Sequence, residues 1–164
     1  MADYSSSSTY ALSRDVTIVD TNVLLAAFWP DDSRHEDTKT FLFEIATSVI
    51  IPVPVLVETW GILVGRSKRW DCGLKLLAWI VNPGSCVTVI DRSEPVGGVQ
   101  ALIESAHIDC VDAYIAHLAD DVTEICDFDP PIRVATYDTG DFVLCRVNHH
   151  IRLRVWDLNS LDVY

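Results

Sequence analysis

Four acidic residues occupy related places in this chain of 164 residues: Asp20, Glu58, Asp112 and Asp138. Asp20 and Asp138 each close an apolar, β-branched run of strand type. Glu58 and Asp112 each lie about one turn into a segment with helical periodicity. Asp141 follows three residues behind Asp138. If the strands are parallel, these carboxylates can converge on one edge of the sheet.

The chemistry of such a group is that of a cation site. Converging carboxylates repel one another and raise one another's pKa values unless a positive charge compensates them. Hard oxygen ligands suit Mg²⁺ or Mn²⁺, which keep water molecules and bridge to substrate phosphates. Asn22, two residues beyond Asp20, could hydrogen-bond a ligating carboxylate or a water on the metal. The set therefore predicts metal-assisted hydrolysis of a phosphodiester.

Most of these acids also have a local explanation. Asp20 could cap a helix, and Asp112 suits a helix start behind an Asp109 cap. Asp138 could open a turn. Glu58 is harder to explain locally, because it interrupts the apolar stretch "VPVLVETWGIL" on a helix that we expect to be largely buried.

Strands and helices that alternate along the chain would position these acids. The expected strands are residues 16–20, 48–53, 86–91, 132–138 and 151–157. The expected helices run from Asp32 or Ser33 to Ala46, from Pro54, from Asp71 to Ile80, from Val99 to Ala106 and from Asp109. Connections of this length need crossovers, which predicts a mostly parallel central sheet of about five strands covered on both faces.

The domain organisation expected is simple. Residues 1–15 are polar and Ser-rich and are predicted to be a flexible N-terminal leader, followed by a single domain over residues 16–164. The hydrophobic content of 49% favours fully buried parallel strands. The sequence indicates neither a secretory signal nor a membrane span, so we expect a cytoplasmic protein. The five scattered cysteines are interpreted as ordinary thiols.

The net charge of −12 argues against a nonspecific nucleic-acid binder, whose affinity would come from Lys and Arg. It is compatible with an enzyme that meets phosphates through a bound cation. One short segment (66–70), "RSKRW", concentrates basic residues beside an aromatic ring. Arg66, Lys68 and Arg69 could hold an RNA backbone, or could simply be the solvated end of a helix.

Four segments in order, "VDTNVLL", "PVLVETWGIL", "DCVDAYIAHLA" and "ATYDTGDF", give the chain a resemblance to the PIN-domain family, metal-dependent ribonucleases that include VapC-type toxins. The resemblance covers about residues 16–157. It implies a three-layer α/β/α sandwich, Mg²⁺ or Mn²⁺ as cofactor and RNA as substrate. It also implies a homodimer and, for many members, a small antitoxin protein as partner.

Carried over onto this sequence, the family's acidic quartet falls on Asp20, Glu58, Asp112 and Asp138. Asp141 is a possible further acid, and the resemblance leaves open whether Asp138 or Asp141 ligates the metal. The metal ligands expected are Asp20, Asp112, Asp138 and Asp141, supported by Asn22 and Thr136. The Ser-rich leader and the scarcity of basic residues depart from a minimal toxin of this kind.

Other classes fit less well. A haloacid-dehalogenase-type phosphatase needs a second Asp where this chain has Asn22, and both it and a response-regulator receiver need a Lys late in the chain. The only lysines are Lys39, Lys68 and Lys75. The remaining alternatives are a stand-alone PIN nuclease of RNA processing or turnover, and a non-catalytic PIN-like module that binds RNA or assembles with a partner.

Overall fold

The computed structural model describes residues 16–91, 96–129 and 131–163. The leader expected over residues 1–15 lies outside the described residues. Within them, no helix combines the length and the apolar character needed to cross a membrane.

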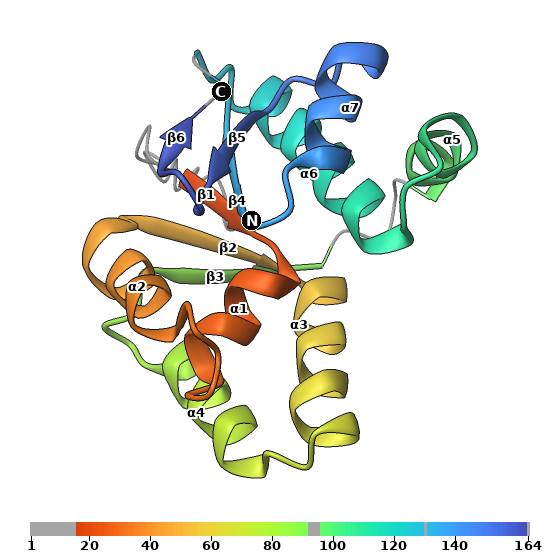
Figure 1. The fold of residues 1–164 in the computed structure, drawn as a ribbon. Coiled ribbons are helices and arrows are strands. Elements are labelled where there is room, and N and C mark those ends of the chain that lie inside the picture. Colours follow the sequence, from red (N-terminus) through yellow and green to blue (C-terminus); the bar gives the residue numbers. More distant parts are fainter. Residues whose placement is uncertain (1–15, 92–95, 130, 164) are drawn as a thin grey trace, which may run out of the picture.

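The centre of the molecule is a mostly parallel sheet with the strand order β3-β2-β1-β4-β5-β6 (Figure 1). Its strands are β1 (Val16–Val19), β2 (Ser48–Pro52), β3 (Val87–Ile90), β4 (Arg133–Thr136), β5 (Arg154–Asp157) and β6 (Asp162–Val163). All neighbours pair in parallel except β5 and β6, which are antiparallel. The predicted sheet is therefore confirmed, with β6 as a short strand that the sequence did not indicate.

Helices cover both faces of this sheet, as predicted. They are α1 (Thr21–Phe28), α2 (His35–Thr40), α3 (Val53–Trp60), α4 (Trp70–Val81), α5 (Val96–Ala106), α6 (Cys110–Ile125) and α7 (Gly140–His149). The chain moves outward from β1 to β3 and then returns to β4 on the other side of β1. Because crossovers are right-handed, this reversal places α1–α4 on one face and α5–α7 on the other, as Figure 1 shows.

The reversal of strand order lies between β1 and β4, which are direct neighbours in the sheet. Open α/β sheets bind ligands outside the carboxyl ends of the strands at such a switch point. Every residue of β1 is buried, and all but the first residue of β4 are buried. The apolar core thus fixes the two strand ends from which Asp20 and Thr136 emerge.

Several helices differ from their predicted bounds, among them α5, which begins at Val96 and not at Val99. The helix expected from Asp32 or Ser33 to Ala46 begins only at His35, and after Thr40 it widens into a π-helical turn. Neither predicted residue caps it, because the Asp32 carboxylate accepts from the backbone and guanidinium of Arg34 instead. A second π-helical turn, over Gly61–Arg66, extends α3.

Candidate active site

Asp20 is the most enclosed of the candidate acids, with 6% of its surface exposed. Its Oδ1 accepts from the backbone N–H of Thr21 at 2.5 Å and caps α1. Its Oδ2 accepts from the Asn22 amide at 2.6 Å and from the Thr136 hydroxyl at 2.7 Å. The side chain at the end of β1 is therefore held from three directions in one orientation.

Asn22 and Thr136 join β1 to β4 around that carboxylate. The Asn22 amide also reaches Thr136 Oγ1 at 3.1 Å, and its own oxygen accepts from the Tyr137 backbone N–H at 3.1 Å. Thr136 Oγ1 accepts in turn from the Asp138 backbone N–H at 2.9 Å. Both residues contact Asp20 as the sequence led us to expect of supporting residues.

Asp112 lies in the first turn of α6, behind the predicted Asp109 cap. Asp109 Oδ1 accepts from the backbone N–H groups of Val111 and Asp112 at 2.7 and 3.0 Å. This N-cap fixes where α6 begins and therefore which residue of its first turn faces the end of the sheet. The prediction that Asp109 caps this helix is thus confirmed.

The electrostatics of the site couple these acids. Burial raises the pKa of Asp112 to about 8, and the charges of Asp20, Asp109 and Asp141 add to the increase. Burial also raises the pKa of Asp20 to about 6, against the hydrogen bonds from Thr136 and Thr21 that lower it. The charge of Asp20 thus acts on Asp112, and both acids have raised pKa values, which is typical of carboxylates that a cation could compensate.

Glu58 does not lie where we expected it. The prediction of a buried carboxylate in α3 is wrong, because α3 buries only one side and Glu58 is exposed. Its Oε2 nevertheless accepts from the Thr21 hydroxyl at 2.6 Å, which ties α3 to the start of α1. The charge of Glu58 is also among those that raise the pKa of Asp20. It therefore belongs to the same cluster, at its solvent side.

Asp138 and Asp141 are placed differently from each other. Asp138 is exposed, two residues beyond the end of β4, and its Oδ1 accepts from the backbone of Gly140 at 3.4 Å. Asp141 is half-buried in the first turn of α7, and its charge raises the pKa values of both Asp112 and the buried Cys145. Of these two acids, Asp141 is therefore the one whose charge acts on Asp112.

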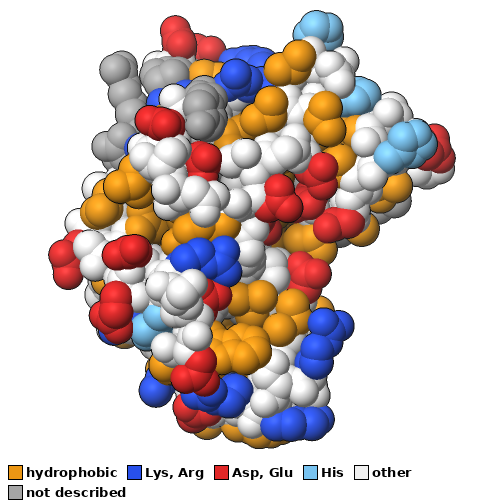
Figure 2. Space-filling model, viewed as in Figure 1, with side chains coloured by type: hydrophobic (Ala, Val, Ile, Leu, Met, Phe, Trp, Pro, Cys, Tyr) orange, Lys and Arg blue, Asp and Glu red, His pale blue; other side chains and the backbone are white. Residues whose placement is uncertain are grey.

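On the molecular surface, Asp and Glu side chains gather at the inner end of an indentation between the α3 region and the α5–α6 region (Figure 2). This indentation opens at the carboxyl ends of β1 and β4, where the strand order reverses. The arrangement can concentrate negative charge beside a solvent-accessible hollow, which is the setting that a divalent cation requires.

The sequence matches the PIN domain family over residues 17–140. The chain belongs to the PIN domain family. No curated protein matches the chain significantly. Among solved structures, the chain is similar to the crystal structure of Mycobacterium tuberculosis VapC20, described as a Sarcin-Ricin loop cleaving toxin. The similarity has a TM-score of 0.57 and 20% sequence identity, and it covers 79% of this chain and 94% of that one. At this identity it shows a shared fold.

The donors of this PIN domain suit a hard cation. Among the described residues, no three His, Cys, Asp or Glu side chains are grouped closely enough to hold a metal ion as they stand. Mg²⁺ does not need such a cage, because it binds through one or two carboxylates and keeps several waters. Asp20 and Asp112 supply oxygen ligands only, and their raised pKa values mark charge that a cation would stabilise.

The predicted basic patch of the PIN domain is only partly available. Arg66 and Lys68 are exposed, and Lys68 donates to the Gly65 carbonyl at 2.6 Å. Arg69 is paired with Asp31 at 2.9 Å and with Asp71 at 3.5 Å. Its positive charge is therefore compensated locally, which weakens the prediction that it contacts RNA.

One residue of the site was missed by the sequence reasoning. Thr21 follows Asp20 directly, and nothing near it in the sequence indicates that its hydroxyl bonds a glutamate 37 residues further on. Only the packing of α1 against α3 brings the two together. In the sequence, the one feature that could have pointed to Thr21 is its hydroxyl next to Asp20.

Proposed function

We propose that this protein is a Mg²⁺- or Mn²⁺-dependent endoribonuclease that hydrolyses phosphodiester bonds of RNA. The observation that carries the proposal is a pair of acids with raised pKa values, Asp20 and Asp112, at the switch point of a PIN-domain sheet. Acids whose pKa values are raised by burial and by neighbouring charges destabilise the fold when they are ionised, and a bound cation offsets that cost.

The residues of the chain divide the work. Asp20 and Asp112 would hold the cation, with Asp141 or Asp138 completing the acidic wall on the α7 side. Asn22 and Thr136 keep the Asp20 carboxylate in one orientation through bonds of 2.6 and 2.7 Å. When bound, the cation neutralises charge on the acids and on a phosphodiester and so lowers the barrier to attack by water.

Glu58 has a separate role in this proposal. Thr21 engages its Oε2, so that Oε1 is left to accept a proton from a water near the phosphodiester. The side chain is exposed and therefore accessible to a substrate strand lying in the indentation. Thr21 orients this carboxylate without touching the substrate itself.

We further propose that the protein is the toxin of a toxin–antitoxin pair, acting in the cytoplasm as a homodimer. The likeness in fold to a toxin described as cleaving the Sarcin-Ricin loop supports RNA as substrate and a small antitoxin as partner. A neighbouring gene for a small DNA-binding protein, whose co-expression relieves growth inhibition by this chain, is the expected finding. Its absence would favour a stand-alone nuclease of RNA processing or turnover.

The enzymatic proposal is tested by incubating RNA with the purified chain in Mg²⁺, in Mn²⁺ and in EDTA. We expect cleavage with either metal and none in EDTA. Asp20→Asn and Asp112→Asn should each abolish it, whereas Asp129→Asn removes an exposed acid near the opposite end of the sheet and should leave it unchanged. Full activity of either site variant would refute the proposal. RNA binding with no cleavage under any condition would favour the non-catalytic module.

A further inference from the structure

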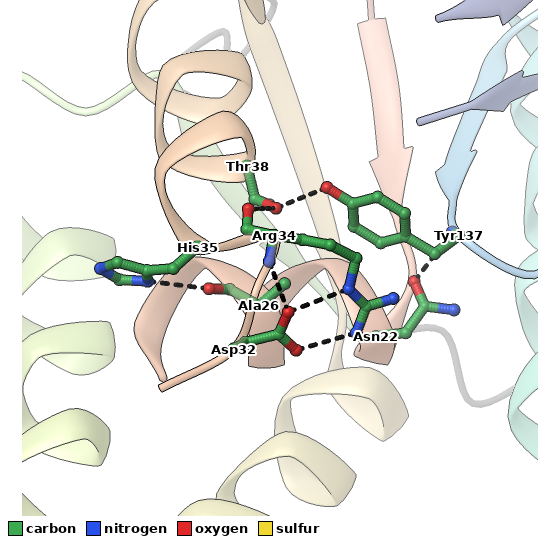
Figure 3. Close-up of polar contacts among 7 residues, drawn as sticks. All are labelled: Asn22, Ala26, Asp32, Arg34, His35, Thr38 and Tyr137. Carbon is green, nitrogen blue, oxygen red and sulfur yellow. Dashed lines mark hydrogen bonds and ion pairs between the residues drawn. The ribbon is translucent and has the colours of Figure 1, made fainter. Parts of the chain in front are cut away.

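Arg34 is held in an unusually well-defined position beside the candidate active site (Figure 3). Its Nε and Nη2 donate to the two oxygens of Asp32 at 3.0 and 2.8 Å, a bidentate contact. Its guanidinium also lies over the ring of Tyr137, 4.3 Å from the ring centroid. The side chain still keeps 40% of its surface exposed. A guanidinium fixed on one edge and one face retains N–H donors on its other edge.

Tyr137 connects this arginine to the acids. It follows Thr136 in the chain, and its backbone N–H donates to Asn22, which itself bonds Asp20. Its hydroxyl shares a hydrogen bond of 2.5 Å with Thr38 in α2. The ring beneath the guanidinium is therefore fixed at both ends, and a short series of contacts leads from the Asp20 carboxylate to Arg34.

Because the chain is strongly negative, a fixed cation beside the acids could help it to bind a phosphate. The net charge is −12, and the acids at the indentation repel the phosphates of any strand that approaches. Arg69, in the predicted basic patch, is already paired with two acids. Within the described part of the chain, Arg34 is paired with one acid, Asp32, which orients it and leaves its outer edge available.

We propose that Arg34, braced by Asp32 and stacked on Tyr137, binds a phosphate of the nucleic-acid strand beside the one that is cleaved. The inference rests on the proposed function and adds to it a substrate-positioning residue outside the acidic cluster. Planar, bidentate geometry of this kind is the form in which arginine recognises phosphate. Stacking on the tyrosine ring keeps the guanidinium in place before the substrate arrives.

The test measures binding of a labelled single-stranded RNA across a series of salt concentrations. The full-length Asp112→Asn chain serves as background so that the RNA stays intact. Adding Arg34→Gln should weaken binding roughly 10-fold and reduce the salt slope by about one, as expected for one lost phosphate contact. Arg34→Lys keeps the charge but lacks the planar fork. Its affinity for the RNA should lie between that of the Asp112→Asn background and that of the chain with Arg34→Gln.

Two controls separate binding from structure. Arg152→Gln removes an exposed arginine just before the amino end of β5, away from the carboxyl ends where Tyr137 lies, and should change neither quantity. Tyr137→Phe loses the hydroxyl bond to Thr38 but keeps the ring under the guanidinium, so it should weaken binding much less than Arg34→Gln does. If Tyr137→Phe weakens binding as much as Arg34→Gln does, the cluster is structural and the inference fails.

The outcomes distinguish this inference from the proposed function. If the unmodified chain cleaves RNA but Arg34→Gln binds it with unchanged affinity and slope, only the inference is overturned. If Arg34→Gln weakens binding while the unmodified chain never cleaves, the inference stands and the enzymatic proposal fails. If the chain neither binds nor cleaves RNA, both are overturned.

Discussion

Asp112→Asn should make the metal-free protein more stable at pH 8 while it abolishes cleavage. The pKa of Asp112 is raised from 3.8 to about 8 in the folded protein, first by burial and then by the charges of Asp20, Asp109 and Asp141. Between these two values the folded state retains a proton that the unfolded state has released. Stability therefore falls as the pH rises through this range. Asparagine does not titrate, and its amide can still donate to Asp109.

The expected magnitude follows from the displacement of the pKa. One pKa unit corresponds to about 1.4 kcal/mol. Asp112 keeps some contact with solvent, which screens its interactions, so we take half of the indicated displacement. The variant should then gain roughly 3 kcal/mol over the parent at pH 8, or about 6–12 °C in melting temperature for a domain of this size. Towards pH 4 the unfolded state recovers much of its proton, so the difference between the two proteins should shrink to less than about 1 kcal/mol.

Thermal unfolding in EDTA, followed by circular dichroism between pH 4 and pH 8, tests this directly. Mg²⁺ should raise the melting temperature of the parent at pH 8 and should have little effect on Asp112→Asn, because the variant lacks a ligand. Asp129→Asn, which removes an exposed acid, should have the melting temperature of the parent at every pH. A variant less stable than the parent at pH 8 would show that Asp112 is not a destabilising charge, and the argument for a cation would lose its main support.

Three further substitutions test single contacts. Thr136→Val removes the hydroxyl that donates to the buried carboxylate at the end of β1, and should cost roughly 1–3 kcal/mol in urea unfolding and most of the cleavage rate. Thr21→Val releases Glu58, and should lower kcat with little change in KM or in stability. Gly73→Ala places a methyl carbon 2.5 Å from a Val64 carbon and should lower the melting temperature. The cleavage rate of the folded variant should equal that of the parent. Unchanged values in any of these assays would contradict the contact concerned.

The parts that the sequence predicted well are those set by local pattern. The apolar runs that end at Asp20 and near Asp138 are strands β1 and β4, and Asp109 caps α6 as expected. Each follows from residues within a few positions of one another, since strand burial and helix capping depend on neighbours along the chain. The crossover rule then suffices to bring the strand ends together.

The parts that it missed depend on contacts between distant segments. Glu58 was expected to be buried because its neighbours are apolar, yet those neighbours cover only one side of α3, and Val57 is 64% exposed. The bond from Thr21 to Glu58 and the stacking of Arg34 on Tyr137 join residues far apart in sequence. No periodicity encodes such pairs, because they arise only when helices pack.

Capping and ligation by Asp20 are compatible when its hydrogen-bond sites are counted. Among the described residues, Oδ1 accepts from the Thr21 N–H alone, while Oδ2 accepts from Asn22 and Thr136. A carboxylate oxygen has two lone pairs, so Oδ2 is saturated and Oδ1 keeps one site free for a cation. Capping α1 therefore fixes the direction of the remaining lone pair rather than consuming it. Capping of α1 and the proposed ligation therefore use different lone pairs of the same side chain, and the two roles are compatible.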